Sequence, residues 1–202
     1  MTRIRVWHGS IGDADVDVIV NASNTQLRLG SGVSAAVAAS CGAGFQARLT
    51  ALREERWPGG MEPGDVVLTD ANAHPRAKHV AHVAVMDYRD RPDARPRPDD
   101  VRIERGCTEL WRQLAALPAP VSVGMVALGA GTGGMGLRDS VSIACRALAR
   151  QLEADAGAIN EVVFVAYDGL EFVNTLAAVR DHFDVDLAGI DPDALRMLEV
   201  LK

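Results

Sequence analysis

The sequence has few cysteines, and it lacks any long apolar run. Its three cysteines, Cys41, Cys107 and Cys145, lie far apart, without a CxxC pair or a nearby histidine. An odd, scattered set argues against a disulfide framework and against a zinc site. We therefore expect three core thiols and no metal. No apolar stretch is long enough to cross a bilayer, and the N-terminus lacks the apolar core of a signal peptide, which predicts a cytoplasmic protein.

Aromatic residues and positive charge are also scarce. Aromatics make up 4% of the chain, and the formal net charge is −6. An acidic chain with few stacking side chains follows a nucleic-acid backbone poorly unless it has a concentrated basic face. The one arginine-dense stretch, residues 89–100, alternates its charge and is broken by prolines, which is typical of a solvated loop. We expect no direct nucleic-acid binding.

Patterning indicates one α/β domain, for which 202 residues are sufficient. Runs of β-branched residues predict strands over 3–7, 16–20, 65–68, 78–85, 121–128 and 161–166. Apolar residues at helical spacing predict helices over 33–40, 44–57, 103–114, 141–152 and 172–183. This alternation predicts a three-layer α/β/α fold with a mixed, largely parallel sheet. We expect the domain to span residues 1–184 and a C-terminal extension, 185–202, to hold one short helix from Pro192.

Ligands of such folds bind where strand ends meet helix N-termini. In the loop over 21–33, Gly30 and Gly32 let a ligand approach the backbone, and the helix that follows presents unpaired N–H groups to an anion. Asn21 and Asn24 offer donors and acceptors to hydroxyl groups. The alternative is a turn in which asparagine caps the chain.

A second glycine-rich loop covers residues 129–136, between a buried strand and a helix. Its N–H groups can form a concave nest around a phosphate. The spacing matches neither a Walker loop nor a dinucleotide fingerprint. Two such loops in one small domain predict a ligand with several phosphates, or with a phosphate flanked by sugars.

Several segments, in order, resemble the macro domain family. Val-Asn-Ala-Ser-Asn over 20–24, followed by Leu-x-x-Gly-Ser-Gly-Val over 27–33, is similar to that family's Val-Asn-Ala-Ala-Asn and Leu-x-x-Gly-Gly-Gly-Val. Segments 64–69, 77–82, 127–134 and 161–168 resemble its later motifs, so the similarity runs from about Gly9 to about Phe183. The resemblance implies a domain that binds ADP-ribose, free or attached to protein, without a cofactor.

The resemblance also implies roles for individual residues. Asn24 would bind the distal ribose and is the one candidate for a catalytic residue, whereas Tyr167 would pack against adenine. The alternative for Tyr167 is an aromatic that only closes the core. The backbone of Gly32 and Val33 would bind the diphosphate. The other ligand-binding candidates are Ser10, Ile11, Asp13, Asn21, Ala22, Gly30, Ser31, Ser34, Gly129, Ala130, Gly131, Thr132, Gly133 and Gly134.

Four positions depart from the family pattern. Ser10 stands where an aspartate receives the adenine amino group, unless Asp13 supplies the acceptor. Ser31 replaces a glycine, which implies a negative φ there or a strained turn. Ser34 replaces an aspartate that activates water in hydrolytic members, and serine alone is no general base. Gly133 replaces an aromatic that packs on the distal ribose.

These departures favour a binding module. The alternative is an ADP-ribosyl hydrolase, or an O-acetyl-ADP-ribose deacetylase, with a non-standard arrangement of the attacking water. A third reading is a domain that binds another nucleotide or only a protein partner.

Overall fold

A computed structural model describes residues 1–89, 98–118, 120–185, 187 and 190–200 of the chain. Most of the arginine-dense stretch, residues 90–97, lies outside the described residues, so the expectation of a solvated loop is untested there.

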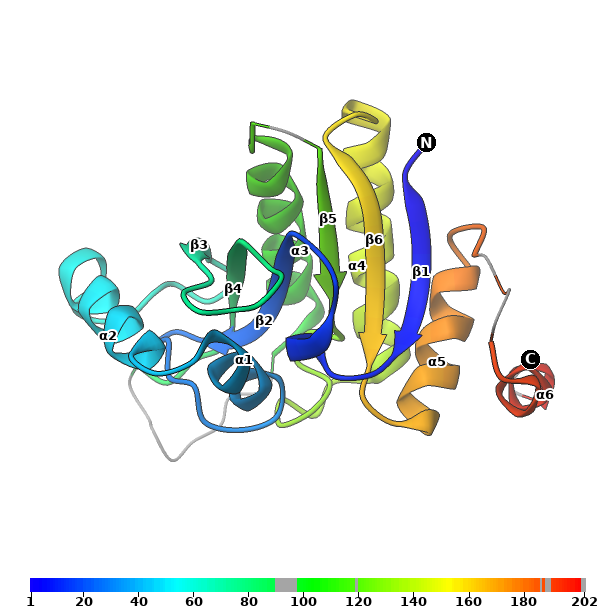
Figure 1. Cartoon of the computed structure of the whole chain (residues 1–202), viewed down its shortest axis with the longest axis horizontal. Helices are drawn as coiled ribbons and strands as arrows, with labels where there is room; N and C mark the ends of the chain where they lie inside the picture. The colour runs from blue at the N-terminus through cyan, green and yellow to red at the C-terminus, as the bar shows by residue number, and fades with distance from the viewer. Residues whose placement is uncertain (90–97, 119, 186, 188–189, 201–202) are drawn as a thin grey trace.

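One six-stranded sheet forms the centre of the molecule, in the order β1-β6-β5-β2-β4-β3 (Figure 1). Its strands are β1 (Arg3–His8), β2 (Val18–Asn24), β3 (Val66–Asp70), β4 (His79–Met86), β5 (Val121–Met125) and β6 (Ile159–Ala166). Neighbouring strands are parallel except β3, which runs antiparallel to β4 at one edge. The predicted mixed, largely parallel sheet is confirmed.

Helices cover both faces of this sheet. They are η1 (Ile11–Asp13), α1 (Val33–Cys41), α2 (Phe45–Arg56), α3 (Asp100–Ala115), α4 (Leu137–Ala154), α5 (Gly169–Arg180) and α6 (Pro192–Val200). His82 of β4 packs on Phe45 of α2, whereas a Cβ on Gly106 of α3 would lie 2.6 Å from Val83. Because successive strand residues point to opposite faces, α2 and α3 cover opposite faces. This confirms the three-layer prediction.

The three cysteines are buried and free, as predicted. Burial raises the pKa of the Cys107 and Cys145 thiols to about 12, so both stay protonated and apolar. They belong to the main apolar core between the layers. In the described part of the chain, no helix combines the length and apolarity needed to cross a bilayer.

Helix α6 packs on the outer side of α5 (Figure 1). Leu198 is 4% exposed and shares a second apolar cluster with Phe172, Val173 and Leu176 of α5. Burial of such a side chain stabilises the fold by roughly 1.5–3 kcal/mol. The C-terminal segment therefore covers apolar surface of α5.

The predicted ends of two strands are wrong by three or four residues. The sequence predicts a strand over 16–20, but β2 runs Val18–Asn24, so Asn21, Ala22 and Asn24 lie in a strand and not in the loop after it. Pairing with β4 sustains β2 up to a register shift between Ser23 and Asn24. Likewise β5 ends at Met125, three residues before the predicted end.

Candidate functional site

A cleft of about 890 Å³ lies at the carboxyl ends of the parallel strands. Its walls come from residues 9–11 after β1, the first turns of α1 and α4, residues 126–127 and 130–131 after β5, and six residues between 165 and 174 around the start of α5. In Figure 1, β1 and β6 point towards the lower edge of the sheet, with α1 and α5 on either side. The sequence predicts a binding site at this place.

Seven of the predicted site residues line the cleft: Ser10, Ile11, Gly32, Val33, Ala130, Gly131 and Tyr167. The remaining eleven do not form its walls: Asp13, Asn21, Ala22, Asn24, Gly30, Ser31, Ser34, Gly129, Thr132, Gly133 and Gly134. The structure thus brings together residues from four separate segments, and it places most of the polar candidates behind or beside them.

The first turn of α1 faces the cleft without an acid or a side-chain cap. Gly32 is the N-cap residue, with φ +55° and ψ −132°, and a Cβ there would meet open space. Only glycine adopts this conformation readily. The preceding Ser31 has a negative φ, as predicted. Among the described residues no side chain caps α1, so its N–H groups and helix dipole favour an anion.

The start of α5, unlike that of α1, carries a side-chain cap and acidic residues. Asp168 is the N-cap residue, and its Oδ1 accepts a hydrogen bond from the N–H of Glu171 (2.8 Å). Glu171 Oε2 accepts one from the N–H of Tyr167 (3.0 Å). These carboxylates already satisfy the helix end and repel a further anion. Neither residue is among the site residues predicted from the sequence, although Asp-x-x-Glu directly before an apolar helix is the pattern of a capping box.

Helix α4 also begins at the cleft, where Leu137 lines the wall. Asp139 lies in its first turn. Of the three described α-helices that start here, α1 alone has neither a side-chain cap nor an acid in its first turn. An anionic group is therefore most stable at α1.

The second glycine-rich loop closes as a compact turn beside α1. Gly129 has φ +76°, and its carbonyl accepts from the N–H of Met135 (3.1 Å). A Cβ on Gly133 would collide with that carbonyl and with Pro98. The absence of an aromatic at position 133 thus has a steric cause. Gly131 is exposed, and a Cβ there would meet nothing within 4 Å.

A chain of buried hydrogen bonds runs behind the cleft. Ser34 Oγ donates to Asn21 Oδ1 (2.9 Å), and Asn21 Nδ2 donates to His82 Nδ1 (3.1 Å). Since an amide nitrogen only donates, Nδ1 is the acceptor and Nε2 carries the proton towards Thr69 Oγ1 (3.1 Å). Complete burial lowers the pKa of His82 to about 3, so the ring is neutral. Ser34 is held in this network and is 6% exposed; among the residues that the structure describes, its hydroxyl donates to Asn21 and to the Ala22 carbonyl, and no base accepts its proton.

The side chain of Asn24 supports a turn. Its Oδ1 accepts from the N–H groups of Gln26 and Arg28 (both 3.1 Å), and its Nδ2 donates to the Arg28 carbonyl (2.8 Å). Leu27, inside this turn, is buried and has φ +52°, a strained value for a leucine. For Asn24 the structure therefore contains the capping turn that the sequence offered as an alternative.

At the other end of the cleft, Tyr167 is 76% exposed, so the alternative that it only closes the core is wrong. Ser10 lines the same cleft. Asp13 is exposed and does not line the cleft; it lies near the side chains of His74 and Arg76. Arg76 donates to the Asp13 carbonyl (2.9 Å).

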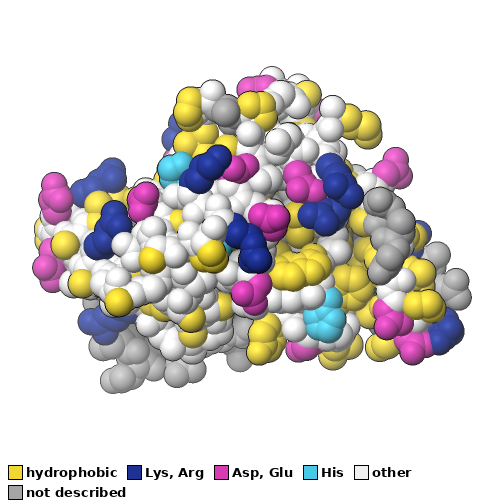
Figure 2. Space-filling view, viewed as in Figure 1, with side chains coloured by type: hydrophobic (Ala, Val, Ile, Leu, Met, Phe, Trp, Pro, Cys, Tyr) yellow, Lys and Arg dark blue, Asp and Glu magenta, His cyan; other side chains and the backbone are white. Residues whose placement is uncertain are grey.

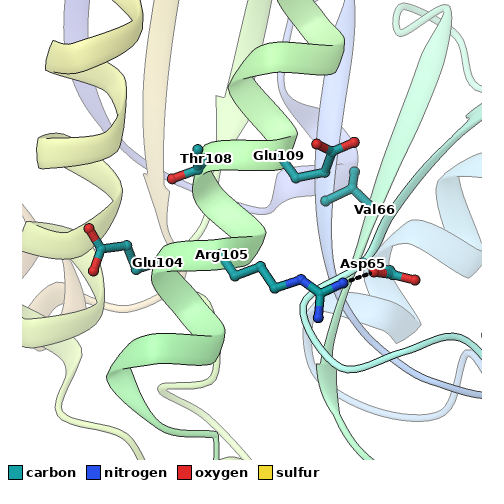
Figure 3. Close-up of a pocket in the computed structure, with 6 residues that line it drawn as sticks. All are labelled: Asp65, Val66, Glu104, Arg105, Thr108 and Glu109. Atoms are coloured by element: carbon teal, nitrogen blue, oxygen red, sulfur yellow. Dashed lines mark hydrogen bonds and ion pairs between the residues drawn. The ribbon is translucent and has the colours of Figure 1, made fainter.

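A second hollow, of about 590 Å³, lies between β3 and α3 (Figure 3). Arg105 pairs with Asp65 across it, while Glu104 points to the other side of α3 and pairs with Arg150. Glu109 pairs with Arg112 along the helix. These charged groups are already paired and largely exposed, so they would stabilise a ligand in this hollow only weakly. Figure 2 likewise shows basic and acidic side chains interspersed over the visible face.

Comparisons with known proteins agree with this geometry. The model of the family described as "Macro domain" matches residues 20–144. A macro domain-containing protein of Xanthomonas campestris is 40% identical over 89 residues, which are 44% of this chain and 49% of that protein. The chain spans about half the length of this relative and of an uncharacterised protein from Thermoplasma acidophilum.

A macro domain-containing protein of Streptomyces griseus is 29% identical over 174 residues, 86% of this chain and 94% of that protein. Among solved structures, a Trypanosoma brucei macrodomain in complex with ADP-ribose has a TM-score of 0.70 at 22% identity, covering 86% of this chain and 67% of the other. The family model covers more than half of the chain, and the fold agrees. The chain therefore belongs to the macro domain family.

Proposed function

We propose that this chain binds ADP-ribose, free or attached to a protein, in the cleft at the strand ends. The observation that carries the proposal is the start of α1, which opens into the cleft without a cap or an acid among the described residues. Family membership supports the choice of ligand, because the solved macrodomain from Trypanosoma brucei holds ADP-ribose and one from Oceanobacillus iheyensis holds ADP.

In this proposal the diphosphate lies between the first turn of α1 and the second glycine-rich loop. The N–H groups of Gly32 and Val33 would donate to it from one side, and the backbone at Ala130 and Gly131 from the other. The adenine ring would lie against Tyr167, whose exposed ring offers a flat apolar surface. The proposed roles of Gly30, Ser31, Gly129, Thr132, Gly133 and Gly134 are to shape the two loops.

The geometry favours binding over hydrolysis. Among the described cleft residues, the titratable side chains are Tyr167, Asp168 and Glu171, all at the α5 end, so none lies beside α1 to activate water there. Ser34 donates its proton to Asn21 inside the protein. Loss of a general base typically lowers a rate by ~10²–10⁴-fold.

The test is calorimetric titration of Gly131→Glu with ADP-ribose. Gly131 lines the cleft, has an ordinary φ and has free space around it, so the variant adds bulk and negative charge without backbone strain. Gly32 is unsuitable because of its positive φ. Gly59→Glu is the matched control, since Gly59 has the same freedom outside the cleft.

We expect the parent and Gly59→Glu to bind ADP-ribose more tightly than AMP, and Gly131→Glu to lose at least about tenfold in affinity. Equal affinity of Gly131→Glu and the parent would contradict this placement of the site. Absence of binding by the parent to ADP-ribose, ADP, AMP and NAD would contradict the function itself.

A further inference from the structure

The end of the cleft at α5 holds acceptor groups that the sequence pattern did not indicate. Glu171 and Asp168 line it beside the exposed ring of Tyr167, and Asn174 lies one turn further along α5. Each carboxylate uses one oxygen in the described hydrogen bonds, Oδ1 of Asp168 and Oε2 of Glu171. A flat aromatic surface bordered by acceptors suits a planar ring that carries hydrogen-bond donors.

We propose that Glu171 is the residue that reads the amino group of the ligand's base, and so makes this cleft selective for adenine over hypoxanthine. The proposal rests on the ADP-ribose binding proposed above and adds its specificity determinant. It gives to Glu171 the acceptor role that the family resemblance left open between Ser10 and Asp13.

Glu171 is better placed for this role than the other candidates. Its Oε2 accepts a hydrogen bond from the backbone N–H of Tyr167, which fixes the carboxylate at this end of the cleft, and both residues line the cleft. It is also half-buried, whereas Asp168 is exposed at the rim. A partly desolvated carboxylate forms a stronger hydrogen bond than a solvated one. Asp13 lies outside the cleft.

The two bases differ in one contact with Glu171, which is attractive for adenine and repulsive for hypoxanthine. In this proposal the six-amino group of adenine donates a hydrogen bond to Oε1 of Glu171, which takes part in none of the hydrogen bonds among the described residues. Hypoxanthine has an oxygen at that position, which a carboxylate repels. The same two acids also set the direction of the ligand, since a diphosphate is disfavoured beside them and favoured at α1.

The experiment compares the affinities of ADP-ribose and its hypoxanthine counterpart for three proteins by calorimetry. Glu171→Gln keeps an oxygen for the N–H of Tyr167 and turns an amide NH₂ towards the ligand. Asp168→Asn is the matched control, because it removes the same charge at the same helix end while asparagine still caps the helix. Thermal melts check that all three proteins are folded.

We expect the parent to prefer ADP-ribose by about tenfold or more, as the loss of a charged hydrogen bond implies. Glu171→Gln should lose or reverse this preference, and Asp168→Asn should keep it. A parent without preference, an unchanged ratio in Glu171→Gln, or an equal loss in both variants would overturn the assignment to Glu171 while leaving ADP-ribose binding intact. A parent that binds neither ligand would overturn both this inference and the proposed function.

Discussion

Complete burial of His82 should make the stability of this protein depend on pH between 7 and 5. The folded protein keeps the ring neutral, since burial lowers its pKa to about 3. In the unfolded chain a histidine has a pKa of about 6.5 and takes up a proton in this range. Because only the unfolded state gains the proton, the free energy of unfolding falls as pH falls below about 6.5.

The size of the effect follows from the proton equilibrium. From pH 7 to pH 5, protonation of the unfolded chain at this one site lowers the free energy of unfolding by about 2 kcal/mol. That figure is insensitive to the folded pKa, provided that it lies well below 5. Burial also lowers the pKa of His74, which adds a contribution of the same sign. The pKa of Asp17 is lowered to about 2, chiefly by its hydrogen bond with Lys78, so the stability it contributes is lost only below about pH 4.

The assay is urea unfolding at pH 7, 6 and 5 for the parent, His82→Gln and Thr69→Val. His82→Gln removes the titrating ring. Between pH 7 and pH 5 the free energy of unfolding of this variant should therefore fall by about 2 kcal/mol less than that of the parent. Thr69→Val removes the partner of Nε2 and no titrating group. Thr69→Val should lower the free energy of unfolding at every pH and should leave its dependence on pH the same as in the parent. The same pH dependence in His82→Gln and the parent would refute the buried neutral histidine.

Three further predictions concern the cleft and its support. Asn24→Ala removes three hydrogen bonds around the strained Leu27 and should lower the free energy of unfolding by about 2–3 kcal/mol in urea titrations. Ser34→Ala should release ADP-ribose from a mono-ADP-ribosylated protein as slowly as the parent does; rapid release by both would favour the hydrolase alternative. We propose that the domain ends near residue 184 and that the extension only covers α5. Leu198→Ala should then cost about 2–4 kcal/mol of stability without changing the Kd for ADP-ribose, and a weakened Kd would contradict this division.

Much of the fold could be predicted because it depends on local patterns. Apolar periodicity distinguished strands from helices, since the two structures expose side chains with periods of 2 and about 3.6. Glycines at 32 and 129 indicated backbone turns, and both have positive φ in the structure. The end of β2 was missed because the partner strand β4 sustains it, and that strand is distant in the sequence.

The sequence by itself determined the layered fold, the glycine loops at the strand ends and the family. Only the tertiary structure decided which polar groups remain free for a ligand. The Asn21 amide is hydrogen-bonded to His82, 61 residues away in the sequence. The Ser34 hydroxyl is hydrogen-bonded to Asn21, so neither side chain faces the cleft. Glu171, in contrast, lines the cleft, and the described hydrogen bonds use only one of its carboxylate oxygens. The physical reason is that a polar group's availability depends on whether folding supplies it with a partner, and partners brought together across a sheet are not neighbours in the sequence.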